Sequence, residues 1–188
     1  MTRADDDEAV ELWQRAAGFA ARSHRNQMRK DGVTPYVAHP FRVAMTVRDV
    51  FGCADGAAIA GALLHDTIED TGADYDEIAE AFGAEVAGLV VAMTKDARLP
   101  EAQREAAYDA QLAKADWRAR LIKLADCYDN LTDLFDRSPA GMSKVLDKCE
   151  RALRLTEADE PAHDETCRAR RALRGLMDRS RRSRPGAK

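Results

Sequence analysis

The segment AAIAGALL, residues 57–64, constrains the fold more than any other part of this sequence. It is apolar on nearly every side when wound into an α-helix, whereas a helix at a protein surface shows one apolar stripe. We therefore expect a helix that starts near Ala54, runs into His65 and lies buried at the centre of the protein.

The rest of the chain is also patterned for helices. Apolar residues recur at helical spacing, and no segment alternates between apolar and polar residues as a strand would. Gly83 and Pro100 stand where helices are expected to stop or start, and residues 26–40 are expected to form a loop. The predicted class is all-α, a compact multi-helix bundle. Its other helices are expected at residues 7–25 (capped by the aspartates at 5–7), 41–51, 75–82, 84–94, 100–113, 117–134, 139–158 and 162–179.

The length of the chain predicts one domain. A sequence of 188 residues can bury a substantial core, and we place the domain at residues 1–180, followed by a basic, flexible tail at 181–188. From Arg168 to Lys188 the only carboxylate is Asp178. Such a charge run is ordinarily a solvated helix end, with binding to nucleic acid or another polyanion as the alternative.

The cysteines and the N-terminal residues indicate the cellular compartment of the protein. The four cysteines are widely spaced and form no C-x-x-C pair, which fits a reducing cytoplasm better than a disulfide framework. The first residues are acidic where a signal peptide would be basic and then apolar. No apolar run approaches the roughly 20 residues that span a bilayer. We therefore expect a soluble cytoplasmic protein.

The motif LLHDTIEDT carries one imidazole and three carboxylates. At about 100° per residue, His65, Asp66, Glu69 and Asp70 fall within an arc of about 140° if they share one helix. Ionisable groups beside an apolar turn are costly to bury unless a metal or opposite charge compensates them. The face either binds a metal or emerges into solvent as the helix ends.

The motif KLADCYDNL places Asp126 and Asn130 four residues apart, on one face of a helix with apolar neighbours. An aspartate that interrupts such a run is either a hydrogen-bonded polar group in the core or a ligand.

The motif RKDGVTPYVAHP places Arg29 and Lys30 before a glycine turn and His39 before a proline. A histidine at a helix start is usually a polar cap, and a basic pair is usually solvated, so this motif indicates little by itself.

Together the three motifs indicate a metal site. His39, His65, Asp66 and Asp126 supply two imidazoles and two carboxylates. This mixed set suits Mn²⁺, Fe²⁺ or Zn²⁺, and an octahedral shell completed by water favours Mn²⁺. The other two histidines, at 24 and 163, have no comparable carboxylate partner, and we interpret both as non-ligands.

The three motifs, in this order and at these separations, resemble the HD-domain hydrolases of the Rel/SpoT type, in particular the stand-alone small alarmone hydrolases. The resemblance runs from about Ala16 to about Lys148 and includes DEIAEAFGAEVAGLV and MTKDARLP. It implies an HD-domain bundle that removes the 3′-pyrophosphate of guanosine tetra- or pentaphosphate. Because a chain of this length leaves no room for the synthetase domain of the long Rel proteins, the resemblance implies a hydrolase without synthetase activity.

The resemblance also assigns roles, position by position. It places the metal ligands at His39, His65, Asp66 and Asp126. It places the catalytic carboxylates at Glu69 and Asp70, and the substrate-binding residues at Arg29, Lys30 and Asn130. Second-tier candidates for phosphate contact are His24, Arg25 and Lys123.

Two departures bear on the substrate. Thr132 stands where the family commonly has arginine, and Asp129 introduces a charge where leucine, histidine or tyrosine is common. Lys144 or Lys148 is a candidate to compensate for the arginine. The departures keep open an HD phosphohydrolase acting on another nucleotide, such as NADPH or a deoxynucleotide. A nucleotide- or nucleic-acid-binding module without turnover is a further alternative, although such a module has no use for a water-activating carboxylate pair.

Overall fold

The computed structural model describes residues 3–134 and 138–182, and this part of the chain is helical without a strand. An isolated bridge between Met28 and Pro35 is the nearest approach to β structure there. The predicted all-α class is confirmed. The elements are α1 (Arg3–Ser23), α2 (Ala38–Met45), the π-helical turn η1 (Thr46–Val50), α3 (Gly56–Leu64), α4 (Thr67–Asp70), α5 (Tyr75–Phe82), α6 (Ala84–Met93), α7 (Glu101–Lys114), α8 (Trp117–Thr132), α9 (Pro139–Leu155) and α10 (Asp164–Arg182).

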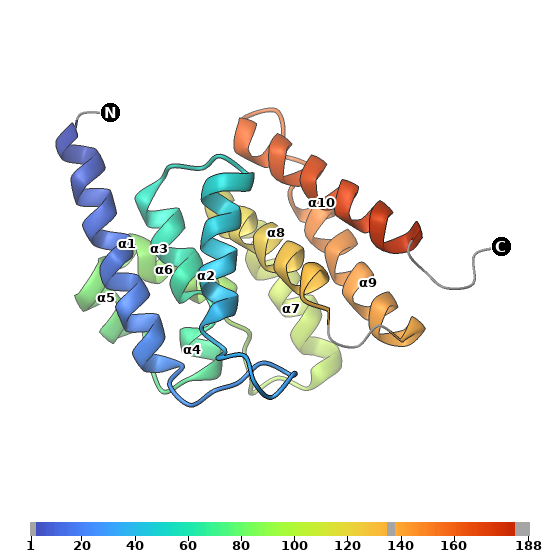
Figure 1. Cartoon of the computed structure of the whole chain (residues 1–188), viewed down its shortest axis with the longest axis horizontal. Coiled ribbons are helices and arrows are strands. Elements are labelled where there is room, and N and C mark those ends of the chain that lie inside the picture. The colour runs from blue at the N-terminus through green and yellow to red at the C-terminus, as the bar shows by residue number, and fades with distance from the viewer. Residues whose placement is uncertain (1–2, 135–137, 183–188) are drawn as a thin grey trace.

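Helix α3 is the buried central helix that the apolar segment predicted. Residues 58–64 are all buried, and α3 packs against α1, α2, α6 and α8. In Figure 1, α1 lies on one side of α2 and α8, and α9 and α10 lie on the other side. The helix starts where the Asp55 side chain accepts a hydrogen bond from the Ala58 N–H at 2.7 Å.

Gly61 allows the close packing around α3. A Cβ at this position would lie 3.2 Å from Ile122 Cδ1 and 3.3 Å from Leu89 Cβ, so α6 and α8 approach the bare backbone. We expect Gly61→Val to destabilise the protein by about 1–3 kcal/mol through overpacking. Gly88 on α6 has no atom within 4 Å of its Cβ position, so Gly88→Val is the matched control and should stay within about 0.5 kcal/mol of wild type. Chemical denaturation measures both, and equal stabilities would contradict the packing argument.

The helix predicted to carry His65, Asp66, Glu69 and Asp70 together is broken, so that part of the prediction is wrong. Helix α3 ends at Leu64 and α4 begins at Thr67. His65 Nδ1 donates to the Ala62 carbonyl at 2.8 Å, and the Thr67 hydroxyl donates to the Leu64 carbonyl at 2.7 Å. These side chains take carbonyls that a continuing helix would use, which favours a turn.

The other helix bounds differ from the predicted ones by a few residues, and α5 agrees at both ends. Helix α1 begins at Arg3, so residues 5–7 lie inside it and do not cap it. Helix α2 begins at Ala38, which moves His39 and Pro40 from the predicted loop into the first helical turn, where proline is tolerated. Residues 183–188 of the predicted tail lie outside the described residues. No helix in the described ranges is long and apolar enough to cross a membrane.

Candidate metal centre and active-site cavity

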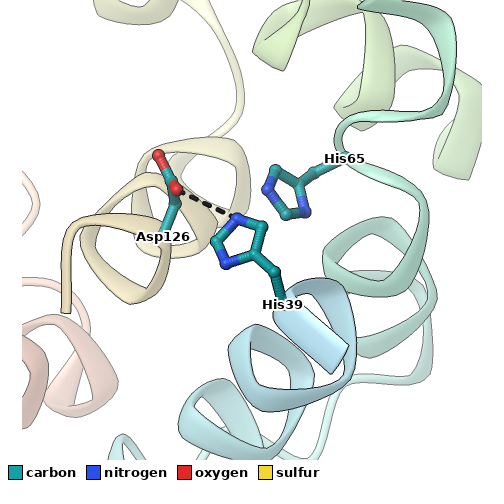
Figure 2. A group of neighbouring side chains, drawn as sticks. All are labelled: His39, His65 and Asp126. Atoms are coloured by element: carbon teal, nitrogen blue, oxygen red, sulfur yellow. Dashed lines mark ion pairs between the residues drawn. The ribbon is translucent and has the colours of Figure 1, made fainter. Parts of the chain in front are cut away.

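Three predicted metal ligands from separate elements converge on one point. His39 comes from the first turn of α2, His65 from the turn after α3, and Asp126 from the middle of α8. One ligand atom from each residue lies within 4.8 Å of the others, and Figure 2 shows the two imidazoles turned toward the carboxylate. Both histidines are buried, with 2% and 1% of their surface exposed.

Both imidazoles present Nε2 to the cluster, because an acceptor holds Nδ1 in each. His65 Nδ1 donates to the Ala62 carbonyl, and His39 Nδ1 donates to Asp129 Oδ2 at 2.6 Å. The buried Nε2 of His65 has no hydrogen-bond partner among the described residues. Metal-binding histidines are commonly held in this way through their second nitrogen. The donor set therefore fits a divalent cation.

Asp66, the fourth predicted ligand, is not part of this group of three but lies beside its two histidines. Its Oδ2 is 3.1 Å from His65 Nε2 and 3.5 Å from His39 Nε2. The Tyr36 hydroxyl donates to the same oxygen at 2.7 Å and lies 2.9 Å from Asp70 Oδ2. Tyr36 thus joins a predicted ligand to a predicted catalytic residue.

The carboxylates of the cluster attract positive charge. Burial alone would lower the pKa of His39, but hydrogen bonds to Asp126 and Asp129 and the charges of Asp126 and Asp66 outweigh it and raise that pKa to about 9. Burial alone would raise the pKa of Asp66, but the neighbouring His65 charge lowers it. Carboxylates that stabilise an imidazolium would equally stabilise a metal cation that displaces its proton.

Asp126 is fixed by neighbours on its own helix. Lys123 Nζ donates to its Oδ2 at 2.8 Å, and Asn130 Nδ2 donates to its Oδ1. Burial would lower the pKa of Lys123, but the Asp126 charge raises it well above its usual value, so the lysine stays charged. Lys123 therefore supports a candidate ligand, whereas the sequence indicated only phosphate contact.

Glu69 and Asp70, the predicted catalytic pair, lie on the short helix α4. The Glu69 carboxylate accepts a hydrogen bond from the Lys95 N–H at 2.9 Å. Burial raises the pKa of Glu69 against the opposing N–H and charge of Lys95. A carboxylate with a raised pKa beside a metal centre is suited to accept a proton from water.

A single cavity of about 1210 Å³ brings all nine predicted site residues together. Arg29 donates to Asn130 Oδ1 at 3.3 Å and to Asp133 at 3.2 Å, and its guanidinium lies 5.7 Å from the centre of the Tyr36 ring. The nine predicted site residues that line the cavity are Arg29, Lys30, His39, His65, Asp66, Glu69, Asp70, Asp126 and Asn130.

Helix α9 contributes basic side chains to the same cavity. Lys144, Lys148 and Arg151 line it, as does Thr132, whose hydroxyl donates to the Tyr128 carbonyl at 2.8 Å within α8. Lys144 and Lys148 therefore line the same cavity as Thr132, the residue that stands where the related hydrolases commonly have arginine.

The remaining histidines lie outside the cavity lining. His24 is buried, with Nδ1 2.8 Å from Gln27 Oε1. His163 stacks on Trp117 with ring centres 3.9 Å apart. Neither belongs to the His39–His65–Asp126 group, and that neither is a ligand stays a prediction. His24 and Arg25, predicted as second-tier substrate contacts, do not line the cavity.

Three residues around the site are not among the predicted site residues: Tyr36, Asp129 and Arg42. Tyr36 lies inside the motif RKDGVTPYVAHP, which was a usable signal. In the sequence Asp129 stands out only as an unusual charge, and no pattern connects it to Arg42.

Comparison with known proteins agrees with this helical metal-site architecture. The HD-domain family model matches residues 16–151, and the chain belongs to the HD-domain family. Human guanosine-3′,5′-bis(diphosphate) 3′-pyrophosphohydrolase MESH1 is 44% identical over 138 residues, which cover 73% of this chain and 76% of the human protein. Within the family, the chain falls in the Rel/SpoT-type hydrolase branch.

Two further relatives define the extent of the similarity. The guanosine-3′,5′-bis(diphosphate) 3′-pyrophosphohydrolase of Aquifex aeolicus is 41% identical over 125 residues, 65% of this chain but only 18% of that longer protein. The solved structure of a metazoan ortholog of SpoT that hydrolyses ppGpp superposes with a TM-score of 0.76 at 29% identity. That match covers 93% of this chain and 96% of the metazoan one, so the fold agrees along nearly its whole length.

Proposed function

We propose that this protein removes the 3′-pyrophosphate of guanosine tetra- or pentaphosphate, so that ppGpp and water give GDP and pyrophosphate. The observation that carries the proposal is the convergence of all nine predicted site residues on one cavity beside the His39–His65–Asp126 cluster. The activities in the names of the similar human and Aquifex proteins support the same substrate.

We propose that His39, His65, Asp66 and Asp126 hold one divalent cation, and that this cation is Mn²⁺. Two imidazole nitrogens with carboxylate oxygens suit Mn²⁺, and Fe²⁺ and Zn²⁺ suit the same donors. Such a cation supplies Lewis acidity, which lowers the pKa of water from about 15.7 toward about 7 and stabilises charge on a phosphoryl group.

The protein's own residues would then manage the proton and the substrate. Glu69 accepts the proton of the attacking water, and Asp70, joined to Asp66 through Tyr36, orients that water. Water adds to the phosphorus on O3′, the P–O3′ bond breaks, and the 3′ oxygen ends protonated in GDP.

Substrate binding would use the two basic walls of the cavity. Arg29 is held by Asn130 and lies over Tyr36, which leaves its planar guanidinium ready to stack on a base. Lys30 and the α9 lysines, Lys144 and Lys148, offset phosphate charge where Thr132 provides none. A cytoplasmic location and the absence of nucleic-acid binding stay predictions.

The test is steady-state hydrolysis of guanosine 3′,5′-bis(diphosphate) by the purified protein with added Mn²⁺. We expect release of GDP and pyrophosphate in equal amounts, and loss of that release with a chelator. NADPH and deoxynucleotides form the comparison panel. Turnover of a panel nucleotide, but not of guanosine tetraphosphate, would contradict the substrate and retain the metal centre. No metal-dependent turnover of any of them would contradict the proposed activity.

A further inference from the structure

Asp129 is a buried carboxylate that directly contacts a candidate metal ligand. Its side chain is 4% exposed, and its Oδ2 accepts the hydrogen bond from His39 Nδ1 at 2.6 Å. A carboxylate buried to this degree needs strong partners, because burial without them disfavours its charge. The burial would raise the pKa of Asp129, but His39 and Arg42 lower it, so the group stays ionised.

Arg42 from α2 holds this carboxylate in place. Its Nε lies 2.5 Å from Asp129 Oδ1 and its Nη2 lies 3.0 Å from Oδ2, a two-point contact that fixes the carboxylate plane. The same Nη2 donates to Asp133 at 2.6 Å. Arg42, Asp129 and His39 thus form a continuous chain from the edge of the bundle to the metal cluster.

The hydrogen bond to Asp129 determines which nitrogen of His39 faces the cluster. With Nδ1 held by Asp129, Nε2 lies 3.3 Å from Asp126 Oδ1 and 3.5 Å from Asp66 Oδ2. His65 is held differently, since its Nδ1 donates to a backbone carbonyl that no substitution removes. Of the two Nδ1 atoms, that of His39 is therefore the one held by a side chain, which a substitution can change.

We propose that Asp129, fixed by Arg42, is a positioning residue that sets the metal affinity of the centre through His39. The inference rests on the proposed metal site. A carboxylate that accepts from the second nitrogen of a ligating histidine fixes its tautomer and strengthens it as a ligand, and removing such partners typically costs about 10- to 100-fold in metal affinity.

The chain offers a control in a second aspartate–arginine pair whose carboxylate is also buried. Asp159 accepts from Arg120 Nε at 2.6 Å and from Nη2 at 2.6 Å, and its side chain is 9% exposed. Neither residue lines the cavity. Asp159→Asn therefore disrupts a similar ion pair and affects stability without touching His39.

The experiment is a titration of the full-length protein with Mn²⁺, followed by the electron paramagnetic resonance signal of free Mn²⁺. We expect Asp129→Leu to weaken binding by about 10- to 100-fold. Asp129→Asn keeps an acceptor but loses the charge, so its loss should be smaller. Asp159→Asn should bind like wild type. Circular dichroism verifies folding, and if Asp129→Leu does not fold, the near-isosteric Asp129→Asn carries the test.

Wild-type affinity in either folded Asp129 variant would overturn this inference. Failure of the wild-type protein to bind Mn²⁺ would instead overturn the proposed metal centre, so the two failures are distinguishable. Steady-state kinetics at saturating Mn²⁺ give a second readout. There, we expect the kcat of Asp129→Asn to approach that of wild type, because added metal compensates for weaker binding.

Discussion

His65→Ala is expected to abolish both Mn²⁺ retention and turnover. The substitution removes a buried imidazole whose Nε2 makes no hydrogen bond among the described residues, lies 3.1 Å from Asp66 Oδ2 and faces the candidate ligands His39 and Asp126. Without the cation, water keeps its ordinary pKa and the phosphoryl charge is not offset, so activity should fall on the order of 10³-fold or more, to the level of chelator-treated wild type. Metal content per chain and pyrophosphate release measure the two effects.

His163→Ala is the control for that experiment. This histidine packs on Trp117 outside the cavity lining, so its loss should lower stability modestly and leave metal content and turnover unchanged. A His65→Ala protein that keeps one Mn²⁺ per chain with wild-type affinity would show that His65 is not a ligand.

Glu69→Gln is expected to retain the metal and lose rate by a factor of about 10² to 10⁴, the range for removing a general base. Glutamine has nearly the same shape and can still accept the hydrogen bond from the Lys95 N–H, so the contact between α4 and the segment after α6 should persist. The loss should appear in kcat, with KM and Mn²⁺ affinity near their wild-type values.

Glu101→Gln provides the comparison, because Glu101 also lines the cavity but sits at the start of α7 and is exposed. It should change kcat by less than a factor of about 3, as expected for a surface substitution away from the chemistry. Wild-type kcat in Glu69→Gln would mean that another group takes the proton, with Asp70 the next candidate.

Much of the fold was predictable because helical periodicity and burial act locally. The apolar residues of α3 required burial at the centre, and Gly83 and the capping Asp74 delimit α5 at the predicted residues. Part of the site was expected for a related reason. The motifs LLHDTIEDT and KLADCYDNL combine polar groups with apolar helical neighbours, which places those groups at the core boundary. The roles of the individual residues came from the resemblance to the HD-domain hydrolases and stay predictions.

The missed features depend on contacts between distant parts of the chain. The break after Leu64 arises where the His65 and Thr67 side chains bond to backbone carbonyls, which periodicity does not encode. Asp129 and Arg42 are 87 residues apart, and only the packing of α2 against α8 brings them together.

The Arg42–Asp129 contact also constrains which substitutions this sequence can accept during evolution. Removing Arg42 alone leaves a buried carboxylate with His39 as its remaining partner, and removing Asp129 alone leaves the Arg42 guanidinium with Asp133. The Asp129 carboxylate is buried whereas the Arg42 side chain is partly exposed, and leaving a buried charge without its partner is commonly more damaging than replacing both residues together. The effects of substitutions at the two positions should therefore depend on each other. Replacing both residues together is the easier evolutionary route, so ancestral reconstruction should find Arg42 and Asp129 appearing on the same branch.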